Sequence, residues 1–244
     1  MNSRRTRGLG ALVSRLFRPG GVNASVGVTP SPRVATPTAS VVRSKALSRF
    51  LALVGEHDAA RFLDLGPVIG ANVTFLGDRI DCKIHVEDLY ADLDRSAADG
   101  TLDQFAEVVA RRLAHSDASI DAALCWDVFD YLDRAAASVL ARELVRILRP
   151  GAVLLAFFAH GRPDEQGYTR YVIAGDEHLQ YEPYPGAARR GPGLENREIL
   201  VLFNDLRIVE SVMLPSGIRE MLFEKPLRVS EGGPPDARAE RSTA

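Results

Sequence analysis

The stretch that decides the fold is "DLGPVIGANV", residues 64–73, which directly follows the apolar run "RFL". It offers an acid, Asp64, and two glycines, Gly66 and Gly70, which permit positive φ and a close approach of the backbone to a ligand. Loops of this kind often carry a third glycine in the middle, where this chain has Val68. A β-branched residue resists positive φ, so we expect Val68 at negative φ.

Apolar runs and amphipathic segments alternate on both sides of this loop. The pattern predicts strands at 60–66, 82–89, 120–129 and 152–160, and helices at 41–57, 72–79, 101–115 and 133–149. Nearly continuous apolar strands separated by helices are typical of a parallel sheet that is covered on both faces.

The end of the chain has a different pattern. A predicted helix at 195–206 precedes two predicted strands, 207–214 and 218–226, which are joined by "PSG". A short connection with Pro and Gly predicts an antiparallel hairpin. The predicted fold is therefore a Rossmann-like, mostly parallel α/β sheet with helices on both faces, closed by a C-terminal antiparallel β-hairpin.

Composition divides the chain into three predicted parts. Residues 1–40 are rich in Pro, Gly, Ser and Thr, and we expect a disordered basic arm there. A short apolar helix face at 9–17 is either a surface-seeking or targeting segment or a frayed tail, and its length favours the tail. One domain is expected at 41–228, with a cap or insertion at about 161–194, and a disordered tail at 229–244.

The overall composition excludes several classes of protein. An apolar fraction of 46% and a charged fraction of 25% are those of an ordinary soluble domain, and no apolar run approaches the ~20 residues of a membrane span. Cys82 and Cys125 lack CxxC spacing, which predicts free thiols in a reducing, cytoplasmic compartment and no metal site. The acidic body shows no clear nucleic-acid site. The scarcity of lysine suggests a GC-rich bacterial genome.

At this point the chain resembles the class I S-adenosylmethionine-dependent methyltransferases. That family usually has an acid-x-Gly-x-Gly-x-Gly loop after its first strand, and Asp64, Gly66 and Gly70 fill its acid, first and last glycine positions. Glu87 in "IHVEDL" matches the acid at the end of the second strand, while 117–132 and 148–158 resemble the fourth and fifth strands. The resemblance covers about 45–227 and implies S-adenosylmethionine as the cofactor and methyl transfer as the reaction.

The resemblance also implies roles for single residues. Asp64 is expected to fix the loop and the amino-acid end of the cofactor, whose carboxylate would meet the amides at the start of the next helix. Glu87 lies 17 residues after Gly70, a spacing that favours contact with ribose hydroxyls over a solvent-facing role. Asp88 beside it can substitute. Asn72 either contacts the cofactor or caps the helix, and its residue type favours capping.

The sequence departs from the family between the second and fourth strands. Arg111 and Arg112 stand where the family's adenine-binding acid is expected, and no clear strand precedes them. We expect a helix within 90–119 in place of the third strand. Ser116 and Asp117 are the candidates for the adenine contact.

Polar residues follow the fourth and fifth strands at the carboxyl ends, where open α/β sheets bind ligands. Trp126 either stacks on a ligand or packs in the core, and the core is the commoner place for a tryptophan. Asp127 is predicted to contact the sulfonium end of the cofactor or the acceptor, because an acid that closes an apolar strand needs a partner. His160 is either a general base or bound to a backbone carbonyl.

The methyl acceptor is not specified by a motif. Methyl transfer depends on positioning and desolvation, so no triad is expected. The signatures of amino and cytosine-ring methylation are absent, and we expect a small-molecule acceptor chosen by the insertion at 161–194. Two alternatives stay open. One is a non-catalytic interaction protein with a degraded pocket, and the other is a nicotinamide-dependent oxidoreductase, which needs a tighter glycine loop.

Overall fold

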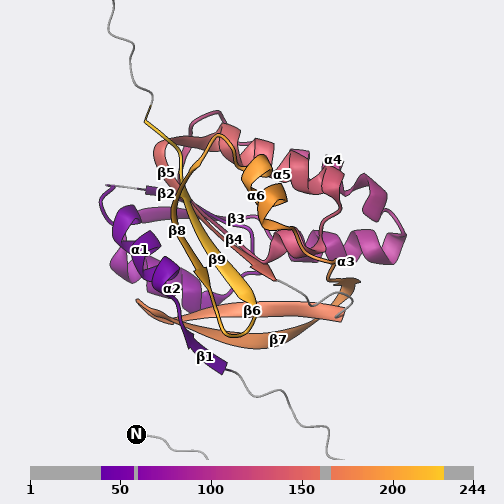
Figure 1. Cartoon of the computed structure of the whole chain (residues 1–244), viewed down its shortest axis with the longest axis horizontal. Helices are drawn as coiled ribbons and strands as arrows, with labels where there is room; N and C mark the ends of the chain where they lie inside the picture. Colours follow the sequence, from indigo (N-terminus) through magenta and orange to yellow (C-terminus); the bar gives the residue numbers. More distant parts are fainter. Residues whose placement is uncertain (1–39, 58–59, 160–165, 228–244) are drawn as a thin grey trace, which may run out of the picture. The chain divides into compact units, whose positions relative to one another are not determined.

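A computed structural model describes residues 40–57, 60–159 and 166–227 (Figure 1). His160, the tail at 229–244 and all of the predicted arm except Ser40 lie outside the described residues. Within the described part, no helix is long and apolar enough to cross a membrane. Cys82 and Cys125 are free cysteines, as predicted.

The main sheet has six strands in the order β3-β2-β4-β5-β9-β8. Four of them are parallel: β2 (Ala60–Asp64), β3 (Cys82–Val86), β4 (Ile120–Trp126) and β5 (Leu148–Ala159). The last two, β8 (Arg207–Met213) and β9 (Ile218–Glu224), form an antiparallel hairpin that adds to β5. This arrangement confirms the predicted Rossmann-like sheet closed by a C-terminal hairpin.

Helices cover both faces of this sheet (Figure 1). The apolar side chains of β4 alternate between two cores: Ala122, Leu124 and Trp126 point to one, and Ala123 and Cys125 to the other. The first core is closed by α1 (Lys45–Val54) and α2 (Gly70–Arg79), and the second by helices that include α5 (Arg134–Ile147) and α6 (Asn196–Leu202). Such alternation is what a strand buried on both faces requires.

The segment between β3 and β4 is helical. It forms α3 (Leu89–Asp99), a short 3₁₀ turn η1 (Leu102–Gln104) and α4 (Phe105–Arg112). Asp88 caps α3, because its carboxylate accepts the amide hydrogen of Ala91 at 2.9 Å. No strand lies between β3 and β4 in this fully described stretch, so β3 is an edge strand. The expected loss of the third strand is confirmed.

A second, three-stranded sheet has the order β1-β7-β6. The predicted insertion supplies β6 (Gln166–Gly175) and β7 (His178–Arg189), which form a hairpin about "AGDE", as expected. Its third member, β1 (Ser40–Arg43), corrects the prediction of a helix at 41–57. The helix starts later because the Ser44 side chain caps α1 by accepting the Leu47 amide.

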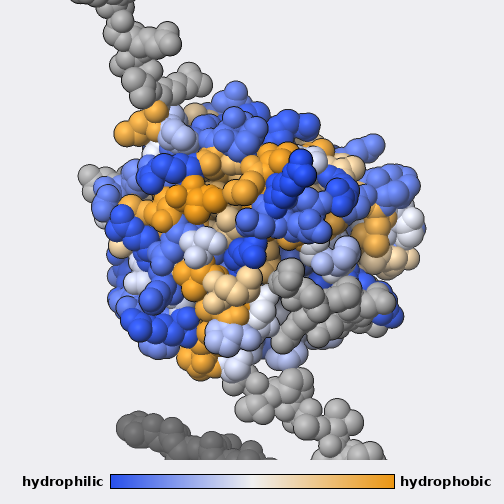
Figure 2. Space-filling model, in the orientation of Figure 1, coloured by the Kyte–Doolittle hydropathy of each residue, from blue (hydrophilic) through white to orange (hydrophobic). Residues whose placement is uncertain are grey.

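The edge of the main sheet at β8 is partly apolar on its surface. Figure 2 shows apolar side chains gathered over β8 and beside α6 among charged ones. Exposed members include Val201 of α6, with 67% of its surface accessible, and Ile208 and Met213 of β8. This apolar surface lies at the opposite edge of the sheet from β3.

Candidate functional site

The loop after β2 follows the predicted path only in part. Val68 is exposed, and it is not among the described non-glycine residues with positive φ, as expected. Neither Gly66 nor Gly70 adopts positive φ, so neither glycine is needed for backbone freedom. Gly66 is needed for space, because a Cβ there would lie 2.6 Å from the indole of Trp126. At Gly70 a Cβ would meet nothing within 4 Å.

Asp64 closes β2 and is almost completely buried, with 4% of its surface exposed. One carboxylate oxygen accepts the Gly66 amide at 2.9 Å and the indole N–H of Trp126 at 2.7 Å. Burial raises the pKa of Asp64 to about 6, against the opposing effect of these two donors. No cationic side chain of the described residues pairs with it. Asp64 is thus a buried carboxyl group whose hydrogen-bond donors among the described residues are both neutral.

Trp126, the last residue of β4, takes an unusual backbone conformation. Its φ is +49°, and the register between β4 and β5 shifts between Leu124 and Trp126. Bulges of this kind re-aim side chains beside active sites, and a bulky residue at positive φ costs about 1–3 kcal/mol. The indole covers Gly66 and stacks on Tyr171 of β6, with ring centroids 5.3 Å apart and planes within 3°. Trp126 is 2% exposed, which bears out the expectation of a core tryptophan.

Asn72, in the first turn of α2, holds the hairpin β6–β7 beside the loop that follows β2. Its side-chain amide donates to the carbonyl of Tyr171 at 2.9 Å, and its oxygen accepts the amide of Ile173 at 2.8 Å. The predicted capping role is wrong, because α2 begins at Gly70 and its N-cap, Ile69, makes no side-chain cap bond. The buried side chain of Asn72 instead makes two hydrogen bonds with the backbone of β6, as a neighbouring strand would.

Two carboxylates beyond β4 share a buried arginine. Arg190, just after β7, contacts Asp127 at 2.6 Å, the hydroxyl of Tyr131 at 2.9 Å, and Asp130 through a short ion pair. Although burial lowers the pKa of Arg190, the two carboxylates raise it above its ordinary value. Burial and the charge of Asp127 raise the pKa of Asp130 to about 8. This cluster anchors the end of the hairpin to the end of β4.

Tyrosines cover the carboxyl edge, which is the edge of the main sheet where its parallel strands end. Tyr90 of α3 donates its hydroxyl to the second oxygen of Asp127 at 2.6 Å, and burial raises the pKa of Tyr90 well above its usual value. Its ring packs edge-on against Tyr131 and Tyr168, with centroids 5.9 and 5.0 Å away. Both carboxylate oxygens of Asp127 therefore already have partners. Its predicted contact with the sulfonium or the acceptor stays a prediction.

The other predicted site residues lie in two different places. Glu87 sits beside Asp64, since its amide donates to the Asp64 carbonyl at 2.8 Å, and its carboxylate lies 3.6 Å from Arg112 and 3.7 Å from His115. Asp117 precedes β4, is 79% exposed in its side chain and pairs with Arg146 at 2.6 Å. The structure thus gathers Asp64, Gly66, Glu87 and Asp127 at the carboxyl edge and leaves Asp117 at the opposite end of β4.

The sequence did not reveal Arg190 or Tyr90 as members of this edge. Arg190 lies 60 residues from Asp130 and 63 from Asp127, so no local spacing links them. The available signal was compositional, because the insertion at 161–194 was expected to cover the pocket. A buried arginine near a strand-end carboxylate pair could have been sought within that insertion.

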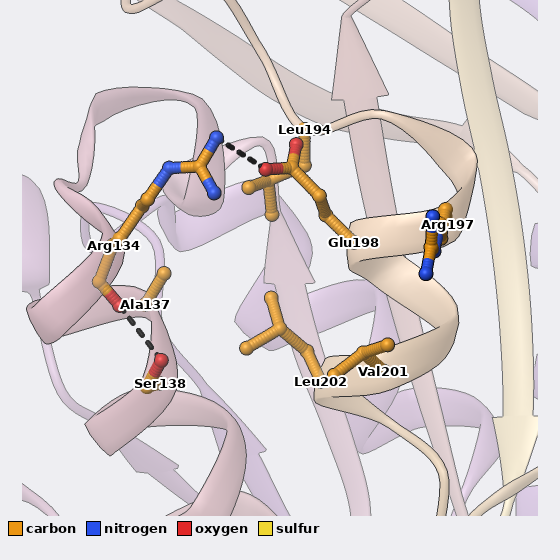
Figure 3. A pocket seen from close by; sticks show the side chains of 8 residues that line it. All are labelled: Arg134, Ala137, Ser138, Leu194, Arg197, Glu198, Val201 and Leu202. Carbon is orange, nitrogen blue, oxygen red and sulfur yellow. Dashed lines mark hydrogen bonds and ion pairs between the residues drawn. The ribbon is translucent and has the colours of Figure 1, made fainter.

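A separate groove lies between α5 and α6. Figure 3 shows its apolar wall, formed by Leu194, Val201 and Leu202, and the 2.5 Å ion pair between Arg134 and Glu198 that spans it. Its volume is about 330 Å³. A neighbouring cavity shares Arg134, Leu194 and Glu198 with this groove and is also lined by Asp130.

Comparison with known proteins identifies one segment. Residues 63–156, less than half of the chain, match the family described as "Methyltransferase domain". The matched segment runs from β2 to β5 and includes Asp64, Glu87 and Asp127. The sequence matches no curated protein.

Solved structures give weaker similarities. A 1,6-didemethyltoxoflavin-N1-methyltransferase from Burkholderia thailandensis is 15% identical, covering 75% of this chain and 79% of that one, with a TM-score of 0.42. The N-methyltransferase NodS from Bradyrhizobium japonicum is 19% identical, covering 74% and 94%, with a TM-score of 0.43. A methyltransferase from Clostridium acetobutylicum is 13% identical, covering 76% and 93%, with a TM-score of 0.46.

These structural similarities are too low to carry an argument about activity. The family match covers the segment that contains the strand-end acids Asp64 and Glu87 and the glycines Gly66 and Gly70. Residues 63–156 match a methyltransferase domain, and over this segment the match agrees with the resemblance that the sequence predicted.

Proposed function

We propose that this protein transfers a methyl group from S-adenosylmethionine to a small-molecule acceptor. The observation that carries the proposal is Asp64, a buried carboxylate beside Gly66 at the end of β2, which pairs with no cationic side chain in the described part of the chain. A buried charge is unfavourable unless it is paired. The methionine end of the cofactor carries an ammonium group, and this cation could pair with the Asp64 carboxylate.

Glu87 supports the same cofactor from the neighbouring strand. Its carboxylate is 22% exposed, and its neighbours Arg112 and His115 are both more than 3.5 Å away, too far for hydrogen bonds. Glu87 is therefore able to accept hydrogen bonds from ribose hydroxyls without breaking a short contact. When bound, the cofactor would supply an activated methyl group on a positively charged sulfur, and this chain would supply binding and orientation.

The hairpin β6–β7 favours a small acceptor. It is fastened over the carboxyl edge by Asn72 at one end and by Arg190 at the other. Asp127 and Asp130 beneath it are each 1% exposed. A bulky side chain on a folded protein substrate does not reach such a covered edge, whereas a small molecule does so after a local opening.

A non-catalytic interaction protein is the second candidate function. The observation that favours it is the commitment of site residues to the fold: Trp126 covers Gly66, Asn72 holds β6, and Asp127 is paired with Arg190. On this alternative the edge is a structural relic. It predicts that the folded protein binds neither S-adenosylmethionine nor its demethylated product.

Calorimetry with S-adenosylhomocysteine tests the proposal. We expect the wild-type protein to bind it, and Asp64→Asn and Glu87→Gln each to weaken binding at least tenfold, because each removes a charged partner. Asp117→Asn is the matched control, since it removes a carboxylate at the opposite end of β4. Absence of binding to folded wild-type protein would reject the proposal, and binding of NADH instead would favour an oxidoreductase.

A transfer assay then separates an enzyme from a binding protein. Protein that binds the cofactor is incubated with S-adenosylmethionine carrying a deuterated methyl group and with the small-molecule fraction of a cell extract. Mass spectrometry should find a deuterated methyl group on an extract component. Cofactor binding without any labelled product would support the non-catalytic alternative.

A further inference from the structure

We propose that Trp126 is a gate: its indole N–H occupies the position on Asp64 that the cofactor's ammonium takes, and cofactor binding moves the indole off Gly66 and Asp64. This inference rests on the proposed function, because it concerns the same site. It adds a movable residue that the sequence interpretation assigned to the core.

The contact with Gly66 shows that cofactor and indole compete for space. The indole lies so close to Gly66 that a single methyl group there would clash at 2.6 Å. The loop backbone at Gly66 is the surface that a ligand would need to approach, and it is covered. Any molecule that reaches Gly66 from this side has to displace the indole first.

The electrostatics of Asp64 make the indole replaceable. An indole N–H is a neutral donor that brings no positive charge, whereas an ammonium group would add a direct attraction between opposite charges to the same carboxylate. The raised pKa of Asp64 shows that burial outweighs the stabilisation by its neutral donors. An ammonium group on Asp64 would therefore gain more than the indole N–H loses.

The backbone of Trp126 is strained in the closed arrangement. A tryptophan at φ +49° is held there by its surroundings: the bond to Asp64, the stack on Tyr171 and an edge contact with Phe157 at 5.8 Å. Release from positive φ returns some of the strain energy when these contacts are given up. A closed state that stores strain is suited to opening in exchange for a better partner.

The gate is coupled to the hairpin through Tyr171. The ring of Tyr171 stacks on Trp126, and its carbonyl accepts the Asn72 amide from the first turn of α2. The hydroxyl of Tyr171 is buried and makes no hydrogen bond with the described residues. Movement of Trp126 therefore removes one of the contacts that hold β6 over the carboxyl edge, which gives an acceptor a way in.

Tryptophan fluorescence tests the gate directly, because Trp126 is the only tryptophan of the chain. The full-length protein is titrated with S-adenosylhomocysteine while emission wavelength and acrylamide quenching are recorded. We expect a shift to longer wavelength and stronger quenching, since an indole that is 2% exposed becomes accessible. Calorimetric binding without any change in emission or quenching would overturn the gate and leave the proposed function intact.

Variants of Trp126 test the gate through the affinity for S-adenosylhomocysteine, also if the wild-type protein does not bind this ligand. Trp126→Ser should bind S-adenosylhomocysteine at least tenfold more tightly than wild type, and Trp126→Phe, which loses only the N–H and part of the ring, should show a smaller gain. Phe203→Leu, a core change in the opposite layer, is the control and should leave affinity unchanged.

The outcomes separate the two proposals. Binding by Trp126→Ser but not by wild type would show that the indole blocks the site without opening, and it would reject both the gate and the proposed function for the native chain. No binding by a Trp126→Ser protein that unfolds cooperatively would reject the gate. If that variant does not fold, Trp126→Phe takes its place, and an affinity equal to or below that of wild type rejects the gate.

Discussion

The ends of β2 and β4 carry two buried carboxylates with opposite surroundings. Asp64 at the end of β2 is 4% exposed and is bound by a backbone amide and an indole. Asp127 after β4 is 1% exposed and is bound by a guanidinium and a phenol. Both have the place in the sheet that a ligand-binding acid needs, but among the residues that the structure describes only Asp127 is paired with a cation.

This difference tells us which acid is available to a cationic ligand. The guanidinium of Arg190 satisfies Asp127 and ties the hairpin to the sheet, so it makes this end of the edge structural. Asp64 has no such cation among the described residues, and an unpaired buried carboxylate is unfavourable for stability. We therefore expect ligand binding at the end of β2, whereas the end of β4 holds the hairpin β6–β7 on the sheet.

Of the changes considered, removal of Arg190 should lower the free energy of unfolding the most. Arg190→Met leaves Asp127 and Asp130 buried without their cation, and breaking a buried ion pair from one side costs about 3–5 kcal/mol. We expect the free energy of unfolding in urea to fall by about that amount. Arg142→Ala, at an exposed arginine on α5, is the control and should cost about 0.5 kcal/mol or less. A loss below about 1 kcal/mol for Arg190→Met would show that the β4 end is not a structural anchor.

The titration of Asp64 should be visible in the pH dependence of stability. Its pKa is raised from 3.8 to about 6, so the folded protein holds the proton more tightly than the unfolded chain. The free energy of unfolding therefore falls as pH rises from about 4 through 6, by about 2–3 kcal/mol for this group.

Asp64→Asn isolates this contribution. Asp130 and Glu220 also have raised pKa values, to about 8 and about 6, and they act in the same direction in both proteins. The stability of the variant relative to wild type should therefore increase by about 2–3 kcal/mol between pH 4 and pH 7. A pH-independent difference between the two urea titrations would mean that Asp64 has a solvated, ordinary pKa.

Removal of the Asn72 side chain should loosen the hairpin at the β2 end. Asn72→Ala leaves the carbonyl of Tyr171 and the amide of Ile173 without partners, and buried unsatisfied groups cost about 1–3 kcal/mol. We expect a loss of about 1–2 kcal/mol and faster hydrogen exchange at Ile173. Thr74→Ala, at an exposed position of the same helix, serves as the reference and should change neither. Unchanged exchange at Ile173 would show that the hairpin is held elsewhere.

The smallest effect is expected at Asp117. Its exposed pair with Arg146 belongs to a class worth about 0.5 kcal/mol, and it lies at the opposite end of β4 from the candidate site. Asp117→Asn should therefore change the free energy of unfolding by no more than that amount and leave the affinity for S-adenosylhomocysteine as in wild type. A tenfold loss of affinity would bring Asp117 back as the adenine contact that its sequence position suggested.

The strands and helices of the main sheet could be predicted because their signals are local. The apolar run before Asp64, the hairpin turn at "PSG" and the helical spacing within 90–119 each depend on neighbours a few residues away. The acids Asp64 and Glu87 could be placed on one edge because adjacent parallel strands bring their carboxyl ends together.

The covering of that edge could not be predicted because it depends on distant partners. Trp126 contacts Gly66, which lies 60 residues earlier in the chain, and no local spacing links the two. Asn72 looked like a helix cap, and its true partners on β6 lie 99 and 101 residues away. Residues 41–43 carry helical spacing, yet they form a strand because β7 offers them backbone partners.

The pairing of β1 with β7 decides where the folded unit begins. Ser40–Arg43 supply backbone partners to β7 from Tyr181 to His178, and the amide of Ser44 adds a bond to Glu177 at 2.7 Å. A shortened protein that started at Lys45, close to where the family resemblance begins, would uncover that length of β7. An uncovered strand edge recruits strands from other molecules. Such a protein would keep every residue of the cofactor loop and still be prone to aggregate during expression.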